Sequence, residues 1–130
     1  MEPSAALEKL REVSAQIETA VIADRGGDVL ASTIDDGARS QTVARAALEL
    51  LGAAERRQPA GGGFAQLEVA LQGGSVFVVS HGDRLIAATT AAEPTVGLVF
   101  YDLKSALRNL DEPEAKPKKP RPARKTSERA

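Results

Sequence analysis

The sequence predicts an α/β domain of the α+β type, in which five antiparallel strands form one sheet flanked by helices. Three observations lead to this prediction. Short β-favouring runs follow one another across glycine-containing turns, the connection that antiparallel neighbours use. Segments with helical apolar spacing stand before, between and after these runs. The length of 130 residues allows one domain with a single core. The predicted order is α-β-β-α-β-β-β-α.

The first element is predicted to be a helix. Leu7, Leu10, Val13 and Ile17 recur at three- and four-residue steps, which places them on one side of a helix. Pro3 suits the first turn, because its missing N–H would have no partner there.

A β-hairpin is predicted next. Residues 19–23 and 29–34 are short β-favouring runs. The segment between them, Asp24-Arg25-Gly26-Gly27-Asp28, supplies glycines for the positive φ angles of a tight turn.

The middle of the chain is predicted to form a long helix that ends at about Arg57. Asp35 and Asp36 are suitable N-terminal caps, and Pro59 and the three glycines 61–63 end the helix. Its apolar residues form two neighbouring stripes: Val43, Ala47, Leu50 and Ala54 in one, and Ala44, Leu48 and Leu51 in the other. An apolar face this wide indicates packing on two surfaces, namely the sheet of the same chain and a second partner.

Three more strands and a final helix complete the prediction. Residues 64–72 alternate between apolar and polar, which is typical of a half-exposed strand. The nearly continuous apolar run of residues 75–80 indicates a central strand covered on both faces, and residues 84–90 follow after a turn. Residues 95–110 carry a helical apolar stripe.

The C-terminal segment differs in composition from the rest. Residues 116–130 hold seven basic residues and one acid, a net charge of +6, which leaves −7 for residues 1–115. Three prolines stand among these charges and Pro113 precedes them, and such a segment buries too little apolar surface to offset its ordering entropy. We therefore predict a folded domain over residues 1–110 and a disordered basic tail over residues 111–130. The basic residues expected to act electrostatically are Lys116, Lys118, Lys119, Arg121, Arg124 and Lys125.

Three ordered patterns resemble the roadblock/dynein-light-chain domain family, especially its bacterial regulators of Ras-like GTPases. They are the hairpin of residues 20–32, the run Val76-Phe77-Val78-Val79 with residues 82–87 after it, and the segment Val96-Gly97-Leu98-Val99-Phe100-Tyr101-Asp102-Leu103. Together with the same order of elements, they give a resemblance that covers Leu7 to Leu110. The basic tail departs from the family pattern, so the resemblance supplies no role for it.

The resemblance implies a dimer that pairs the long middle helix and the following strand across a two-fold axis. Carried onto this chain, the interface consists of Val43, Ala47, Leu50, Leu51, Ala54, Leu67 and Val69. The partner chain would be a second copy or another roadblock chain. Arg45, Glu49 and Arg56 are candidate contacts with a small Ras-like GTPase.

Other chemical roles are less well supported by the residues. His81 is the only histidine, and with no cysteine there is no metal-ligand spacing, so it is interpreted as a turn or surface residue. The glycines at 61–63 lack the Lys-Ser or Lys-Thr of a phosphate-binding loop. Four aspartates, 24, 28, 35 and 36, fit turn and cap positions better than a cation site. Arg56 and Arg57 suit a helix C-terminus, although an arginine finger remains an alternative.

The function predicted is that of a non-enzymatic, dimeric regulator or scaffold for a small Ras-like GTPase, without cofactor or metal. The absence of cysteine and of a long apolar run favours a cytoplasmic protein without a membrane span. A small-molecule-sensing module is the alternative from another class, although three Phe and one Tyr supply few walls for a cavity. A third possibility is attachment to nucleic acid or another acidic surface through the tail.

Overall fold

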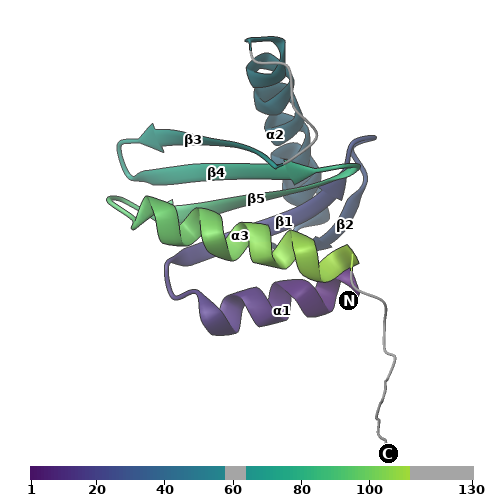
Figure 1. The fold of residues 1–130 in the computed structure, drawn as a ribbon, viewed down its shortest axis with the longest axis horizontal. Coiled ribbons are helices and arrows are strands. Elements are labelled where there is room, and N and C mark those ends of the chain that lie inside the picture. Colours follow the sequence, from purple (N-terminus) through teal and green to yellow (C-terminus); the bar gives the residue numbers. More distant parts are fainter. Residues whose placement is uncertain (58–63, 112–130) are drawn as a thin grey trace, which may run out of the picture.

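The structure of the chain, a computed structural model, describes residues 1–57 and 64–111. Three helices and five strands follow the predicted order (Figure 1). The helices are α1 (Pro3–Val13), α2 (Gly37–Arg57) and α3 (Val96–Asp111). The strands are β1 (Ile17–Asp24), β2 (Val29–Ser32), β3 (Ala65–Leu71), β4 (Gly74–His81) and β5 (Arg84–Ala91). No helix in these described ranges is long and apolar enough to cross a membrane.

The strands form one antiparallel sheet with the order β2-β1-β5-β4-β3. Its centre joins the two halves of the chain, because β1 pairs with β5 and Ala20 lies opposite Ala88. The short strand β2 and the longer strand β3 occupy the two edges. The five-stranded antiparallel sheet that the sequence predicted is therefore confirmed.

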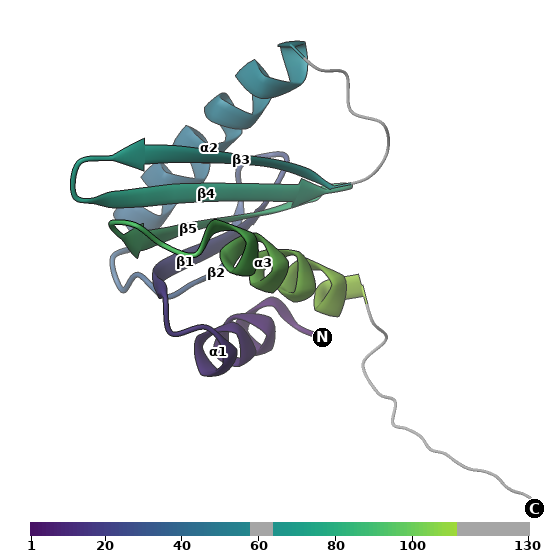
Figure 2. The ribbon, with the colours of Figure 1, turned by 60° about the vertical axis from the view of Figure 1, so that its left-hand side comes forward.

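The helices cover the two faces of the sheet unequally. α1 and α3 lie side by side on one face, and α2 crosses the other face (Figures 1 and 2). Each face has its own apolar core. Phe77, Ile86 and Leu103 lie in the core beneath α1 and α3, whereas Val78 and Leu51 lie in the core beneath α2. Successive side chains of β4 therefore enter the two cores in turn, which confirms that this strand is covered on both faces.

Local chemistry accounts for the ends of several elements. Pro3 begins α1, as expected. The Asp36 carboxylate accepts hydrogen bonds from the backbone N–H groups of Ala38 (2.9 Å) and Arg39 (3.3 Å), so Asp36 caps α2. Gly27, in the β1–β2 turn, has a φ of +93°, a conformation that L side chains rarely adopt.

The predicted stripe of the first helix was wrong at its C-terminal end. α1 ends at Val13, whose side chain is 61% exposed, and Ile17 begins β1 instead of continuing the helix. The backbone at Ser14 is extended, and its N–H donates to the carbonyl oxygen of Leu10, which closes the last turn. The predicted helix-ending residues 58–63 and the tail beyond Asp111 lie outside the described residues.

Candidate protein–protein interface

The long helix α2 attaches to the sheet through one narrow stripe. Ser40, Ala44, Ala47 and Leu51 follow the three- and four-residue spacing of a helix, and each of them is buried. Because three of these four side chains are small, the helix approaches the sheet closely. Leu51, the one large residue, packs among Val21, Val78 and Leu85 in the core beneath α2.

The opposite side of α2 is exposed over its whole described length. Its residues are Thr42, Arg45, Ala46, Glu49, Leu50 and Ala53. This exposed side divides lengthwise into two parts. Ala46, Leu50 and Ala53 continue from the half-buried Val43 at alternating steps of three and four residues, the spacing of a helix–helix seam. Arg45 and Glu49 lie beside that seam and give the other part a charged surface.

Contacts with the β1–β2 turn fix the rotation of α2 about its own axis. Gln41, Leu48 and Glu55 are spaced by seven residues, so they lie along one flank of the helix. The Gln41 side chain donates to the carbonyl oxygen of Gly27 (2.5 Å), and Leu48 lies close to the same glycine. Both Gly27 contacts are made from the β1–β2 turn, so this turn sets which side of α2 faces outward.

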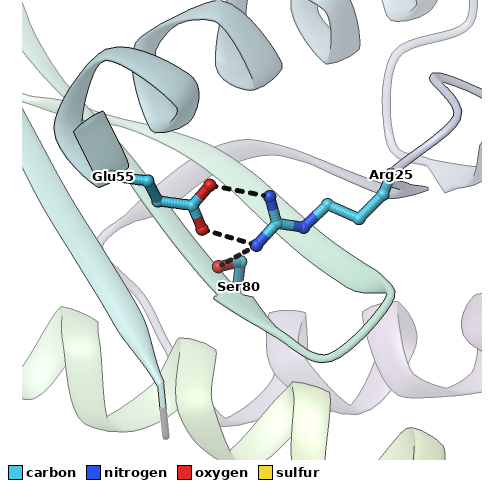
Figure 3. Close-up of polar contacts among 3 residues, drawn as sticks. All are labelled: Arg25, Glu55 and Ser80. Atoms are coloured by element: carbon cyan, nitrogen blue, oxygen red, sulfur yellow. Dashed lines mark hydrogen bonds and ion pairs between the residues drawn. The ribbon is translucent and has the colours of Figure 1, made fainter. Parts of the chain in front are cut away.

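Arg25, from the same turn, holds the C-terminal part of α2. Its guanidinium donates to both carboxylate oxygens of Glu55, at 2.7 and 3.1 Å, and more weakly to the Ser80 hydroxyl at 3.4 Å (Figure 3). The backbone N–H of Arg25 donates to the carbonyl oxygen of Asp83 (2.9 Å), which joins the turn to the β4–β5 turn. The paired geometry is specific to a guanidinium and a carboxylate.

The electrostatics of this pair agree with its geometry. The two hydrogen bonds from Arg25 lower the pKa of the Glu55 carboxyl, against the opposing effect of desolvation. The same bonds raise the pKa of Arg25, with smaller contributions from the charges of Glu55 and Asp83. Both groups are therefore charged at neutral pH, and the ion pair is intact there.

The edge strand β3 continues the apolar part of α2. Leu67 and Val69 are half-buried, and Leu67 packs with Val43 against the core beneath α2. Leu71 points to the same side of the strand and is 59% exposed. Within the described residues β3 pairs only with β4, so its outer edge presents unpaired backbone groups. We define the α2–β3 surface as Val43, Ala46, Leu50, Ala53, Leu67, Val69 and Leu71.

The structure separates the predicted interface residues into two groups. Val43, Leu50, Ala54, Leu67 and Val69 keep exposed surface. Ala47 and Leu51 are only 2% and 1% exposed, so these two residues belong to the core of the chain and offer no surface to a partner. Ala46, Ala53 and Leu71 are exposed on the same surface, and the prediction from the sequence did not include them. The alternating spacing of 43, 46, 50 and 53 was the signal that identifies the first two.

The predicted partner contacts lie beside this surface. Arg45 and Glu49 are exposed on the charged part of α2. The side chain of Arg56 lies outside the described residues.

The remaining candidates have structural roles. His81 is the last residue of β4, half-buried where the chain enters the β4–β5 turn, and its ring stacks on Phe64 with a centroid distance of 4.5 Å. The Asp24 carboxylate accepts from the backbone N–H groups of Gly26 and Asp28 within the turn. Among residues 1–57 and 64–111, no group of three acidic or histidine side chains is arranged to hold a metal ion. The glycines at 61–63 lie outside these ranges.

This arrangement defines a class of protein: a small antiparallel α+β domain with helices on both faces of one sheet. Within the described residues, one side of α2 and the outer edge of β3 are uncovered. Comparison with solved structures then identifies the fold, which is that of the Roadblock/LC7 domain. A Roadblock/LC7 domain from Streptomyces avermitilis has a TM-score of 0.72 and 18% sequence identity, over 85% of this chain and 95% of that one.

Two bacterial proteins named MglB have the same fold. The gliding protein MglB of Thermus thermophilus has a TM-score of 0.65 and 21% identity, over 83% of this chain and 87% of that one. MglB of Myxococcus xanthus has a TM-score of 0.65 and 17% identity, over 83% and 90% of the two chains. No protein-family profile and no curated protein sequence matches the chain. The likeness therefore rests on the fold, and it confirms the roadblock fold that the resemblance in the sequence implied.

Proposed function

We propose that the chain is a non-enzymatic, dimeric regulator or scaffold that binds a small Ras-like GTPase. The observation that supports this most directly is the α2–β3 surface, an uncovered apolar area on a fold shared with the MglB proteins. The family resemblance in the sequence supplies the GTPase as the class of partner.

The dimer is proposed to form through the α2–β3 surface of two copies. Consider two α2 helices that pair in antiparallel orientation and cross at Leu48. Ala46 of one copy then lies opposite Leu50 of the other, and Val43 lies opposite Ala53. Each large side chain then meets a small one, which allows close packing across a two-fold axis. The edges of the two β3 strands would meet beside the helices and satisfy their backbone groups. A heterodimer with another roadblock chain would use the same surface.

The GTPase is proposed to contact the charged part of α2. Arg45 and Glu49 are exposed and stand outside the apolar seam, so a dimer leaves them accessible. In the two-fold arrangement the two copies of these residues form one continuous charged platform. Such rim charges mainly set the rate and selectivity of association.

The first test is the solution mass of the full chain over a concentration series, measured by light scattering. Wild type is expected to be a dimer. Leu50→Glu places a charge in the middle of the seam and is expected to give a monomer. Leu98→Glu is the matched control, because Leu98 is 50% exposed on α3, away from the seam. A wild-type chain that stays monomeric at high micromolar concentration, both alone and with candidate roadblock partners, would contradict the dimer.

The second test is titration with a small Ras-like GTPase carrying a fluorescent nucleotide, in its GDP and GTP-analogue forms. Arg45→Glu combined with Glu49→Arg is expected to weaken binding without changing the dimer mass. Hydrolysis measured in parallel distinguishes a regulator from a scaffold. Equal binding by wild type and the double variant would exclude the charged part of α2 as the contact.

A further inference from the structure

A second surface lies on the opposite side of the sheet, between the two helices that cover it. α1 and α3 pack against each other, and a half-open groove with a volume of about 280 Å³ runs between them. Leu10, Val13 and Lys9 line it from α1, and Tyr101, Asp102 and Asn109 line it from α3. This α1–α3 groove shares no residue with the α2–β3 surface.

One carboxylate in the groove has no protein partner. Asp102 as a whole residue is 8% exposed, and its side chain makes no hydrogen bond or ion pair within the described ranges. Its oxygens are not among the fully buried atoms without a partner, so the carboxylate opens onto the groove. Lys9, on the opposite wall, is exposed and does not pair with it. A carboxylate that opens onto a groove attracts a cationic side chain. Asp102 therefore marks a position where a cationic group would fit.

The groove also presents apolar side chains at one end. Tyr101 is 62% exposed and Val13 is 61% exposed, although both are large enough to be expected in a core. Proline-rich segments in the polyproline II conformation bind grooves lined by aromatic side chains, and their extended form costs little ordering entropy. An exposed tyrosine next to the Asp102 carboxylate thus fits a peptide that combines proline with Lys or Arg.

The sequence contains such a peptide shortly after α3, the helix that forms one wall of the groove. Residues 116–125 read Lys-Pro-Lys-Lys-Pro-Arg-Pro-Ala-Arg-Lys, and they begin five residues after the end of α3. Asp102 lies nine residues back along α3 from Asp111, or about 14 Å at 1.5 Å per residue. Five residues of extended chain span about 16 Å at 3.1 Å each. The chain can therefore turn back at the end of α3 and bring its first basic residues to Asp102.

We propose that the chain's own segment 116–125 occupies the α1–α3 groove, with a Lys or Arg side chain paired with Asp102 and proline rings against Tyr101 and Val13. The opposite net charges of the two parts of the chain, +6 and −7, favour this contact. The proposal does not depend on the dimer or on the GTPase, since it uses the other face of the sheet.

The test uses the full chain with one spin label. Because the sequence has no cysteine, Ala123→Cys provides a single attachment point for a nitroxide. Broadening of backbone amide signals by the label is then measured by nuclear magnetic resonance. Val13, Tyr101 and Ser105 are expected to broaden strongly, whereas Arg45 and Glu49 on the far face keep their intensity. Equal broadening on both faces, or none at the groove, would overturn the proposal.

Two variants determine whether the contact is specific. Asp102→Asn keeps the shape of the side chain and removes its charge, and it is expected to abolish most of the selective broadening. The double variant Lys118→Glu, Lys119→Glu changes only segment 116–125. It therefore tests the charge pairing even if Asp102→Asn destabilises the folded domain. Broadening that survives in the segment variant would contradict the charge pairing. A mixture of isotope-labelled and spin-labelled chains is expected to show no effect, and broadening seen only in that mixture would contradict an intramolecular contact.

Discussion

Arg25 and Glu55 are 30 residues apart in the sequence, yet they form a two-point hydrogen-bonded ion pair between the β1–β2 turn and the last turns of α2. Together with the Gln41–Gly27 hydrogen bond, this pair holds the helix at two places along one flank. The proposed dimer seam lies on the other flank, so the contacts that orient α2 are separate from those that would bind a partner.

Breaking this pair is expected to lower stability. Glu55→Gln keeps the side-chain length and one hydrogen-bond acceptor but removes the charge, and it leaves the Arg25 guanidinium partly buried without its counter-ion. The midpoint of thermal unfolding should fall relative to wild type. Glu49→Gln, on the exposed side of the same helix, should leave it unchanged. Arg25→Lys should not restore wild-type stability, because an ammonium cannot make the paired contact.

The contribution of Glu55 should also depend on pH in a definite direction. Its pKa in the folded chain is lowered from the ordinary value of 4.5, so the folded state binds this proton less readily than the unfolded state. The stabilisation is therefore fully present above 4.5 and is lost as the pH falls through the lower, folded-state value. Denaturation curves of wild type and Glu55→Gln should differ most near neutral pH and converge in acid. A difference that grows on acidification would contradict this account.

Gly74, at the start of β4, is expected to tolerate no side chain. A Cβ atom there would lie against the carbonyl oxygen of Thr90 on β5, well inside van der Waals contact, and this oxygen belongs to the sheet backbone. Gly74→Ala should cost about 1–3 kcal/mol in the free energy of unfolding, the usual range for overpacking. Gly73→Ala, one residue earlier, meets no atom within 4 Å and should be close to neutral. Chemical denaturation of the two variants compares them directly.

Two neighbouring leucines of α2 should behave differently when shortened. Leu51→Ala removes a fully buried side chain and should cost about 2–5 kcal/mol through the cavity it leaves. Leu50→Ala removes a side chain that is 38% exposed on the seam. Its effect on the unfolding midpoint should depend on protein concentration, as expected for a weakened dimer. If the unfolding midpoint of Leu50→Ala falls by the same amount at every protein concentration, Leu50 stabilises the monomer and not a dimer.

The sequence was a good guide to the elements and a weaker one to their outward faces. Turn glycines and period-two alternation located all five strands, because these signals are local. Ile17 was assigned to the first helix since its spacing from Val13 is helical, and only the extended backbone at Ser14 breaks that pattern. Spacing along the chain cannot show where a helix stops when the following strand begins with an apolar residue.

The candidate interface shows the same limit. Two apolar stripes on α2 were recognised, but which one faces the sheet depends on the rotation of the helix. That rotation is set by contacts of Gly27 and Arg25 with residues 14 and 30 positions away. Alanine carries little information, since it suits both a close approach to a sheet and a close approach to another helix. Ala47 was therefore placed on the wrong side, and Ala46 and Ala53 were missed.

The central pairing of β1 with β5 has a consequence for how the chain folds during synthesis. Ile17 pairs with Thr90 and Asp24 with Arg84, so the middle of the sheet joins segments that are made at opposite ends of the domain. Contacts so distant in sequence form slowly, because a long loop must close first. Until β5 has left the ribosome, the hairpin of β1 and β2 has no inner neighbour, and α1 has no α3 to pack against. Folding of the sheet must therefore wait until nearly the whole domain has been translated.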